Sequence, residues 1–167
     1  GAITQWSLIG TFENISASGF EKVFDPELEF KVKKQYTGKR GVPAQWFNIS
    51  KLRHDNWVDL THYFGNKDAI YYGNTFVYSP EKRVVHVRVG TSGSVKTILN
   101  DEEIISVFEE RNNDLDTYIV ETELQQGWNR LLIKCGYSEI TQCNFLVRIT
   151  DKKGDALTDL QYETKAK

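Results

Sequence analysis

The side chains of this sequence that could bind a small ligand are aromatic and polar residues close together in the chain. Trp, Tyr and Phe make up 13% of the residues, and a planar ring can stack on the apolar face of a sugar while nearby carboxylate, amide or guanidinium groups bond its hydroxyls. Seven such residues between positions 46 and 72 are the candidates: Trp46, His54, Asp55, Trp57, Tyr63, Tyr71 and Tyr72. On a regular strand Tyr71 and Tyr72 point to opposite sides, so these rings cannot all enter one core. The pattern indicates either sugar stacking by at least one ring or ordinary core packing.

No set of residues has the types and spacing of a catalytic or zinc site. His54, His62 and His86 lie apart or near a single carboxylate, and such pairs do not supply the three or four ligands that zinc needs. The sequence leaves open a structural calcium site formed by loop carboxylates and carbonyls. The sequence contains no Gly-x-Ser-x-Gly turn for a serine nucleophile, and Glu109-Glu110 is expected as a solvated strand end. We therefore expect no catalysis within this chain.

Two cysteines, Cys135 and Cys143, flank a segment with the composition of a hairpin loop. If the flanking strands pair in register, the two thiols could face each other and form a disulfide in an oxidising compartment. Two free, half-buried thiols are the alternative. Neither arrangement is a metal site, because no second Cys or His pair accompanies them.

Length and charge limit the class of protein. A chain of 167 residues with a formal net charge of −2 makes about one domain and has no basic surface suited to nucleic acid or anionic membrane. No apolar run approaches the ~20 residues of a membrane span, and the first residues do not resemble a signal peptide. The chain has no Met at all, so we expect a domain cut from a longer protein or a processed form.

The elements that must position the candidate residues are short strands separated by turns. β-branched, alternating segments cut by Gly, Asn and Asp are typical of an antiparallel sandwich, and Asn100-Asp101 is expected to form a two-residue hairpin turn. Residues 13–30 are expected as a covering loop in which Asp25-Pro26-Glu27 excludes a regular helix. We expect one helical turn, near 108–112. Over 151–167 we expect a polar, partly disordered tail with Leu157, Leu160 and Tyr162 as candidate anchors. The expected strands are 6–12, 44–49, 56–60, 69–78, 83–90, 94–99, 103–108, 117–123, 129–134 and 144–150.

Several of these segments resemble the galactose-binding-like jelly-roll modules found in bacterial secreted and surface proteins, often beside glycoside hydrolases or peptidases. The likeness spans roughly residues 6–150. It is carried mainly by Trp6-x-Leu8-Ile9-Gly10-x-Phe12, by Val95-Lys96-x-Ile98-Leu99-Asn100 and by Gly127-Trp128-Asn129-Arg130-Leu131-Leu132-Ile133-Lys134. Relatives commonly have Gly where this chain has Asp101, and acidic residues where it has Thr91-Ser92-Gly93-Ser94. These departures weaken a calcium or sugar role for that turn.

The resemblance implies a single all-β jelly-roll sandwich over 1–150 that serves as a non-catalytic accessory module of an extracytoplasmic bacterial protein. Its partners would be a polysaccharide or glycan and other domains of the parent chain, with no nucleic acid and no membrane insertion. The glycan would lie at a loop end or on a concave face. Trp57, Tyr71 or Tyr72 would stack on it, and His54, Asp55 or Arg88 would bond its hydroxyls. The alternative is a structural or protein-interaction module that binds no small ligand.

Overall fold

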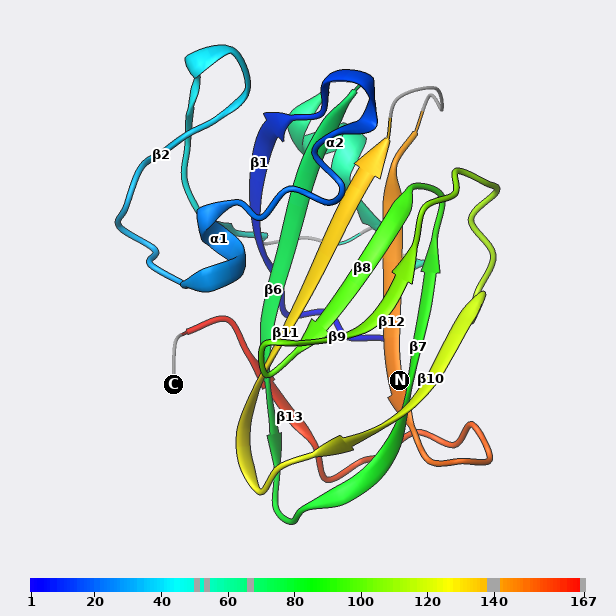
Figure 1. Ribbon diagram of the computed structural model, residues 1–167. Coiled ribbons are helices and arrows are strands. Elements are labelled where there is room, and N and C mark those ends of the chain that lie inside the picture. Colours follow the sequence, from blue (N-terminus) through cyan, green and yellow to red (C-terminus); the bar gives the residue numbers. More distant parts are fainter. Residues whose placement is uncertain (50–51, 53–54, 66–67, 138–141, 166–167) are drawn as a thin grey trace.

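The computed structural model describes residues 1–49, 52, 55–65, 68–137 and 142–165. Its described residues form two antiparallel sheets that face each other, with shorter elements around them (Figure 1). The all-β sandwich expected from the sequence is therefore confirmed, whereas the jelly-roll connectivity stays a prediction.

The larger sheet has seven strands in the order β4-β1-β6-β11-β8-β9, and β13 pairs with β6 as well. β6 and β11 are the longest strands and pair along their whole length, from Ala69↔Tyr137 to Ser79↔Gly127. The bounds are β1 (Ser7–Glu13), β4 (Phe47–Asn48), β6 (Ala69–Ser79), β8 (Ser94–Leu99), β9 (Glu102–Val107), β11 (Gly127–Tyr137) and β13 (Gln161–Glu163).

The smaller sheet has four strands in the order β10-β7-β12-β5. Its bounds are β5 (Val58–Asp59), β7 (Arg83–Thr91), β10 (Tyr118–Leu124) and β12 (Asn144–Thr150). The remaining elements are the two-stranded pair β2 (Tyr36–Thr37) and β3 (Pro43–Ala44), the helices α1 (Asp25–Leu28) and α2 (Leu60–Phe64), and 3-10 turns at Ile15–Ala17 and Lys39–Gly41.

The turn between β8 and β9 has the expected form. Asn100 and Asp101 both have positive φ, 50° and 67°, and the strands close on them with Leu99 opposite Glu102. Two successive positive φ values are the backbone of the hairpin turn that matches the right-handed twist of its strands. The sequence prediction of a two-residue turn here is confirmed.

The larger sheet is buried on both faces, and the side chains of Tyr71 and Tyr72 lie on opposite faces of it. The main core lies between the two sheets and contains Tyr71, with Trp6 packed edge-on against Phe145 at 4.9 Å. A second apolar cluster contains Tyr72 together with Phe12 and Trp46. Since adjacent residues on a strand face opposite sides, the second cluster lies on the outer face of the sheet, beneath the segment between β1 and β6.

The covering segment is fastened to the sheet by buried charges. The ammonium of Lys134, on β11, lies 2.8 Å from the carboxylate of Glu27 in α1. Tyr72 donates its hydroxyl proton to the same carboxylate. Arg130, also on β11, donates to the Pro26 carbonyl at 2.7 Å and to Asn74 Oδ1 at 2.7 Å. The α1 turn is therefore held by side chains of the strand beneath it.

Two sequence expectations about the short elements are wrong. Asp25-Pro26-Glu27 forms the helical turn α1, because a proline in the first turn of a helix needs no intrahelical partner for its nitrogen. The helical turn expected near 108–112 has no helical structure. In the polar segment after β12, Leu160 is buried as an anchor, and β13 pairs with β6.

Candidate functional site

The two tyrosines expected to stack on a ligand are not available to one. Tyr71 and Tyr72 are both 0% exposed, and burial raises the pKa of each phenol. Tyr71 donates to the hydroxyl of Tyr137 at 3.2 Å. The expectation of a tyrosine platform is therefore wrong for this structure: each ring packs into an apolar cluster, one on either face of the sheet.

Trp57 and Arg88 lie on the outer face of the smaller sheet. The indole of Trp57 is only 8% exposed and covers Gly90, where a Cβ would lie 2.8 Å from the ring and 2.5 Å from the Asp114 carbonyl. Asp55 accepts the Trp57 backbone N–H at 3.3 Å, and His54 lies outside the described residues. The structure thus places Asp55 beside Trp57, and Arg88 two residues along β7 from Gly90, but Trp57 offers no open ring face.

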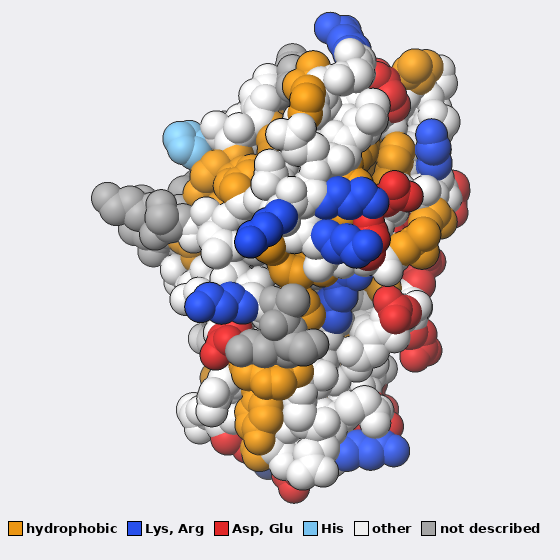
Figure 2. Space-filling model, turned by 90° about the vertical axis from the view of Figure 1, so that its left-hand side faces the viewer, with side chains coloured by type: hydrophobic (Ala, Val, Ile, Leu, Met, Phe, Trp, Pro, Cys, Tyr) orange, Lys and Arg blue, Asp and Glu red, His pale blue; other side chains and the backbone are white. Residues whose placement is uncertain are grey.

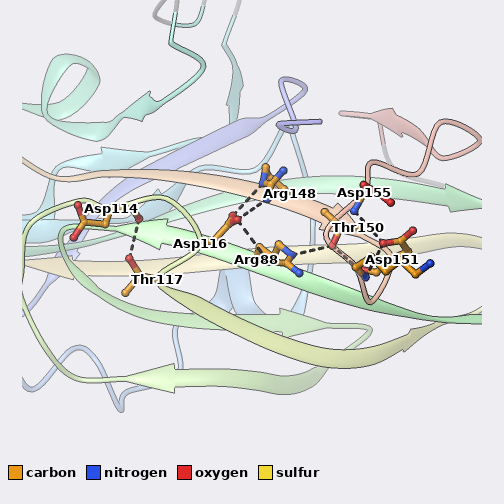
Figure 3. A network of polar contacts seen from close by, with 9 residues as sticks. Arg88, Asp114, Asp116, Thr117, Arg148, Thr150, Asp151 and Asp155 are labelled. Atoms are coloured by element: carbon orange, nitrogen blue, oxygen red, sulfur yellow. Dashed lines mark hydrogen bonds and ion pairs between the residues drawn. The ribbon is translucent and has the colours of Figure 1, made fainter.

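Arg88 belongs to a network that holds the segment just before β10 against the smaller sheet (Figure 3). Its Nε donates to Thr150 Oγ1 at 2.9 Å, and its Nη1 lies 3.6 Å from Asp116. Arg148, directly opposite Arg88 on β12, donates from Nε to Asp116 at 3.0 Å. The bond from Arg148 is the main reason why the pKa of Asp116 is lowered. Because Arg88 and Arg148 both pair with Asp116, Arg88 has a structural role in this network.

Cys135 and Cys143 are free, buried thiols. Cys135 lies on β11 of the larger sheet, whereas Cys143 directly precedes β12 of the smaller one, so the two do not flank a paired hairpin. The Cys143 thiol lies within hydrogen-bonding reach of Cys135, and this contact and burial raise its pKa. The strand-pairing argument for a disulfide is therefore wrong, although the two sheets bring the thiols together.

We predict that both thiols react with Ellman's reagent only when the protein unfolds. The reactive species is the thiolate. Both sulfurs are buried, and the raised pKa of Cys143 further suppresses the thiolate of that residue. The folded protein should label slowly, and two equivalents should appear in denaturant. An immediate reaction of the folded protein would contradict the buried placement, and no free thiol in denaturant would show a disulfide.

A cleft of about 380 Å³ lies at one end of the sandwich, where β1, β9 and β11 end and β8 begins. We call it the loop-end cleft. Its aromatic lining residues are Phe20, Phe108 and Tyr137, and its polar lining residues are Asn14, Ser94, Glu109 and Glu110. This lining combines rings with hydroxyl, amide and carboxylate groups.

The lining side chains of the loop-end cleft differ in how firmly they are held. Phe108 is 64% exposed and packs on the buried Phe20, with ring centroids 5.2 Å apart. Asn14 accepts the Gly19 backbone N–H at 3.0 Å. Gly19 lets this loop close, because a Cβ there would lie 2.3 Å from the Glu13 carbonyl. Burial raises the pKa of Tyr137. The exposed ring of Phe108 thus packs on the buried ring of Phe20, beside a loop that the Gly19–Asn14 hydrogen bond holds closed.

Comparisons with known proteins identify no family for this chain. No family model matches it, and no curated protein matches it. A solved structure of a beta-glucosidase from Kluyveromyces marxianus in complex with glucose aligns with 92% of this chain at 15% identity and a TM-score of 0.42. The alignment covers 16% of that chain. A likeness at this level carries no argument about function.

The described residues show no metal-binding cluster and no membrane-spanning helix. Within the described ranges, no three His, Cys, Asp or Glu side chains gather as a metal-binding group. The same ranges contain no helix that is both long and apolar enough to cross a membrane. A calcium role for loop carboxylates and carbonyls stays a prediction.

The residues of the loop-end cleft were not expected as a site from the sequence. Glu109-Glu110 was expected as a solvated strand end, and no ligand-binding role was expected for Phe108. One signal was present, since a phenylalanine followed by two glutamates at the end of a strand places a ring beside carboxylates. Asn14 and Tyr137 gave no comparable signal, because only the fold brings residues 14, 94, 108 and 137 to one end of the sandwich.

Proposed function

We propose that this chain is a non-catalytic carbohydrate-binding module of a larger extracytoplasmic protein and that a glycan binds in the loop-end cleft. The observation that carries the proposal is the exposed ring of Phe108 beside Asn14, Ser94 and the two glutamates. A sugar needs both kinds of group, because its ring has an apolar face and a rim of hydroxyls. A volume of about 380 Å³ lies within the range of small-ligand sites.

The surface of the smaller sheet gives less support to the alternative of a docking module. A docking face should be broad and mostly apolar. Exposed Ile119 and Val84 do lie on β10 and β7. Beside them, however, His86 Nε2 of β7 lies 3.5 Å from Glu121 of β10, and Arg88 of β7 pairs with Asp116, which precedes β10. Charged side chains thus interrupt the apolar ones.

A binding role also accounts for the carboxylates of the cleft better than catalysis does. Most glycoside hydrolases place two carboxyl groups on either side of the scissile bond, so that one acts as acid and the other as base or nucleophile. Glu109 and Glu110 instead follow each other on one segment, and Glu109 lies 3.5 Å from Arg111. They are suited to accept hydrogen bonds from sugar hydroxyls.

The test is a thermal-shift and calorimetric screen against neutral plant and microbial oligosaccharides, followed by Phe108→Ala. A glycan that binds only the folded state raises the melting temperature. Loss of ring stacking should weaken binding by about tenfold, which corresponds to roughly 1.4 kcal/mol. The matched control is Leu115→Ala, which removes another exposed apolar side chain outside the cleft. Equal binding by Phe108→Ala, or no binding of any glycan, would overturn the proposal.

A further inference from the structure

A second cleft, of about 310 Å³, lies at the edge of the larger sheet beside β4. We call it the edge cleft. The aromatic residues of its wall are Phe30, Trp46 and Phe47. The Phe47 ring also packs on Tyr63 and Phe64, with centroids 5.8 Å apart in each pair. Phe30 packs on Trp46 with centroids 4.9 Å apart and on Phe76 at 5.4 Å, so the wall is fixed by ring contacts. The edge cleft and the loop-end cleft share no lining residue.

The edge cleft exposes apolar surface and contains an unsatisfied donor. Phe47 is 37% exposed and Val32 is 46% exposed, and both line the cleft. Trp46 is buried, and its Nε1 finds no hydrogen-bond acceptor among the described residues. Buried polar groups are nearly always hydrogen-bonded, so each exception needs an explanation. Nε1 is itself covered by protein atoms, so a ligand oxygen would supply the missing acceptor once the side chains that cover the indole edge shift.

The polar side chains of the edge cleft favour a negatively charged ligand. Lys165 is its charged lining residue, and no carboxylate is among the described residues that line it. Val32 stands between Lys31 and Lys33 in the chain. Figure 2 shows this side of the molecule, where Lys and Arg side chains lie among exposed apolar ones. The loop-end cleft differs, because it is lined by two glutamates and no basic residue among those described.

We propose that the edge cleft is a second binding site and that it takes a sugar ring bearing a carboxylate, such as a uronic acid residue. The exposed ring of Phe47 would stack on the sugar, and the ammonium of Lys165 would pair with the carboxylate. Asn48 is held by a hydrogen bond from Ser7 Oγ to its Oδ1 at 2.6 Å, which leaves its Nδ2 to donate to a hydroxyl. Thr164 adds a second hydroxyl-binding group.

A sugar ring fits this site better than an acidic peptide does. The volume of about 310 Å³ is near the lower limit for small-ligand sites, which suits one or two rings. An extended peptide would instead add to a sheet edge through several main-chain hydrogen bonds. The strand at this edge, β4, has only two residues, so it offers little backbone for such pairing.

The experiment compares a galacturonic acid trisaccharide with its carboxyl-reduced galactose counterpart, by calorimetry on the wild-type protein. The acidic sugar should bind at least about tenfold more tightly, and this preference should shrink as salt screens the ion pair. Lys165→Gln should remove the preference, and Phe47→Ala should weaken both sugars. Both side chains are exposed, so the variants should fold, which melting curves check.

Phe108→Ala is the matched control, because it alters only the loop-end cleft. It should leave binding of the acidic trisaccharide unchanged. The proposal is overturned if the reduced sugar binds equally well, if neither sugar binds, if Lys165→Gln keeps the preference, if Phe108→Ala abolishes binding or if a hexaglutamate peptide competes as effectively. Because neutral-glycan binding at the loop-end cleft is measured separately, failure of one proposal leaves the other standing.

Discussion

Replacing Lys134 with methionine is expected to lower the free energy of unfolding by about 3–5 kcal/mol, as for other buried ion pairs that lose one partner. The Lys134 side chain is 1% exposed, and it lies 2.8 Å from Glu27, itself 10% exposed. The ammonium also donates to the Lys22 carbonyl. Without it, the Glu27 carboxylate keeps the hydroxyl of Tyr72 but loses its positive partner. Urea denaturation at neutral pH measures the effect.

A double-mutant cycle separates the ion pair from the packing of the lysine stem. Adding Glu27→Gln to Lys134→Met removes the uncompensated charge, so the double variant should recover part of the loss. Lys82→Met is the control: Lys82 lies 3.4 Å from Glu123, but both side chains are exposed. An exposed pair contributes about 0–1 kcal/mol. A loss of similar size for Lys82→Met and Lys134→Met would show that the buried pair does not anchor the covering segment.

The strands were predictable because their signal is local. From β6 to β12 each strand alternates apolar and polar residues or forms a β-branched run bounded by turn residues, and every expected strand from 69 to 150 is present within a few residues. Helix α2 also had a local signal that was overlooked. Asp59 caps it by accepting the His62 N–H, and Gly65 ends it in the left-handed conformation.

Other elements depend on contacts that no local pattern reveals. Helix α1 has four residues and is held by Lys134 and Arg130 from β11. Strand β13 exists because β6 extends beyond the end of its pairing with β1 and offers free backbone at residues 76–78. Isolated segments this short have little stability of their own. Their positions follow from tertiary structure.

The candidate site was less predictable than the fold for the same reason. Alternation correctly places Tyr71 and Tyr72 on opposite faces of β6, but it cannot show that the segment between β1 and β6 covers the outer face. That cover buries Tyr72, which contacts Phe12 at 5.7 Å. Likewise, Phe20 and Phe108 are far apart in the chain and meet only at the end of the sandwich. Proximity in sequence therefore selected two tyrosines, Tyr71 and Tyr72, that the fold buries.

Asn129→Ala is expected to destabilise the protein by about 3 kcal/mol or more, because each buried group left unsatisfied costs about 1–3 kcal/mol. Asn129 is fully buried. Its Nδ2 lies within hydrogen-bonding distance of the carbonyls of Val77, Gln125 and Gly127, at 3.0–3.2 Å. Its Oδ1 accepts the Gln125 N–H at 2.9 Å and Nδ2 of Asn100 at 2.8 Å. Alanine provides none of these bonds.

The test is urea denaturation combined with hydrogen exchange at two amides. The Gln125 N–H, which donates to Asn129 Oδ1, should exchange faster in Asn129→Ala. The Arg130 N–H, which donates to Asn100 Oδ1, should respond as well, because Asn100 loses its anchor. Asn112→Ala, at an exposed position, is the control and should change stability by less than about 0.5 kcal/mol. Unchanged exchange at Gln125 would contradict the assignment.

The position of Asn129 gives this prediction a wider meaning. Asn100 and Asn129 belong to two of the segments that carry the resemblance to galactose-binding-like modules. Their side chains bond each other, Asn100 Oδ1 accepts the Arg130 N–H of β11, and Asn129 bonds the backbone of Gln125 and Gly127 at the entry to β11. In this chain these segments close the hairpins of the larger sheet. A chain can keep such segments while its ligand site changes, so we expect the proposed glycan sites among residues such as Phe108 and Phe47, which these segments do not include.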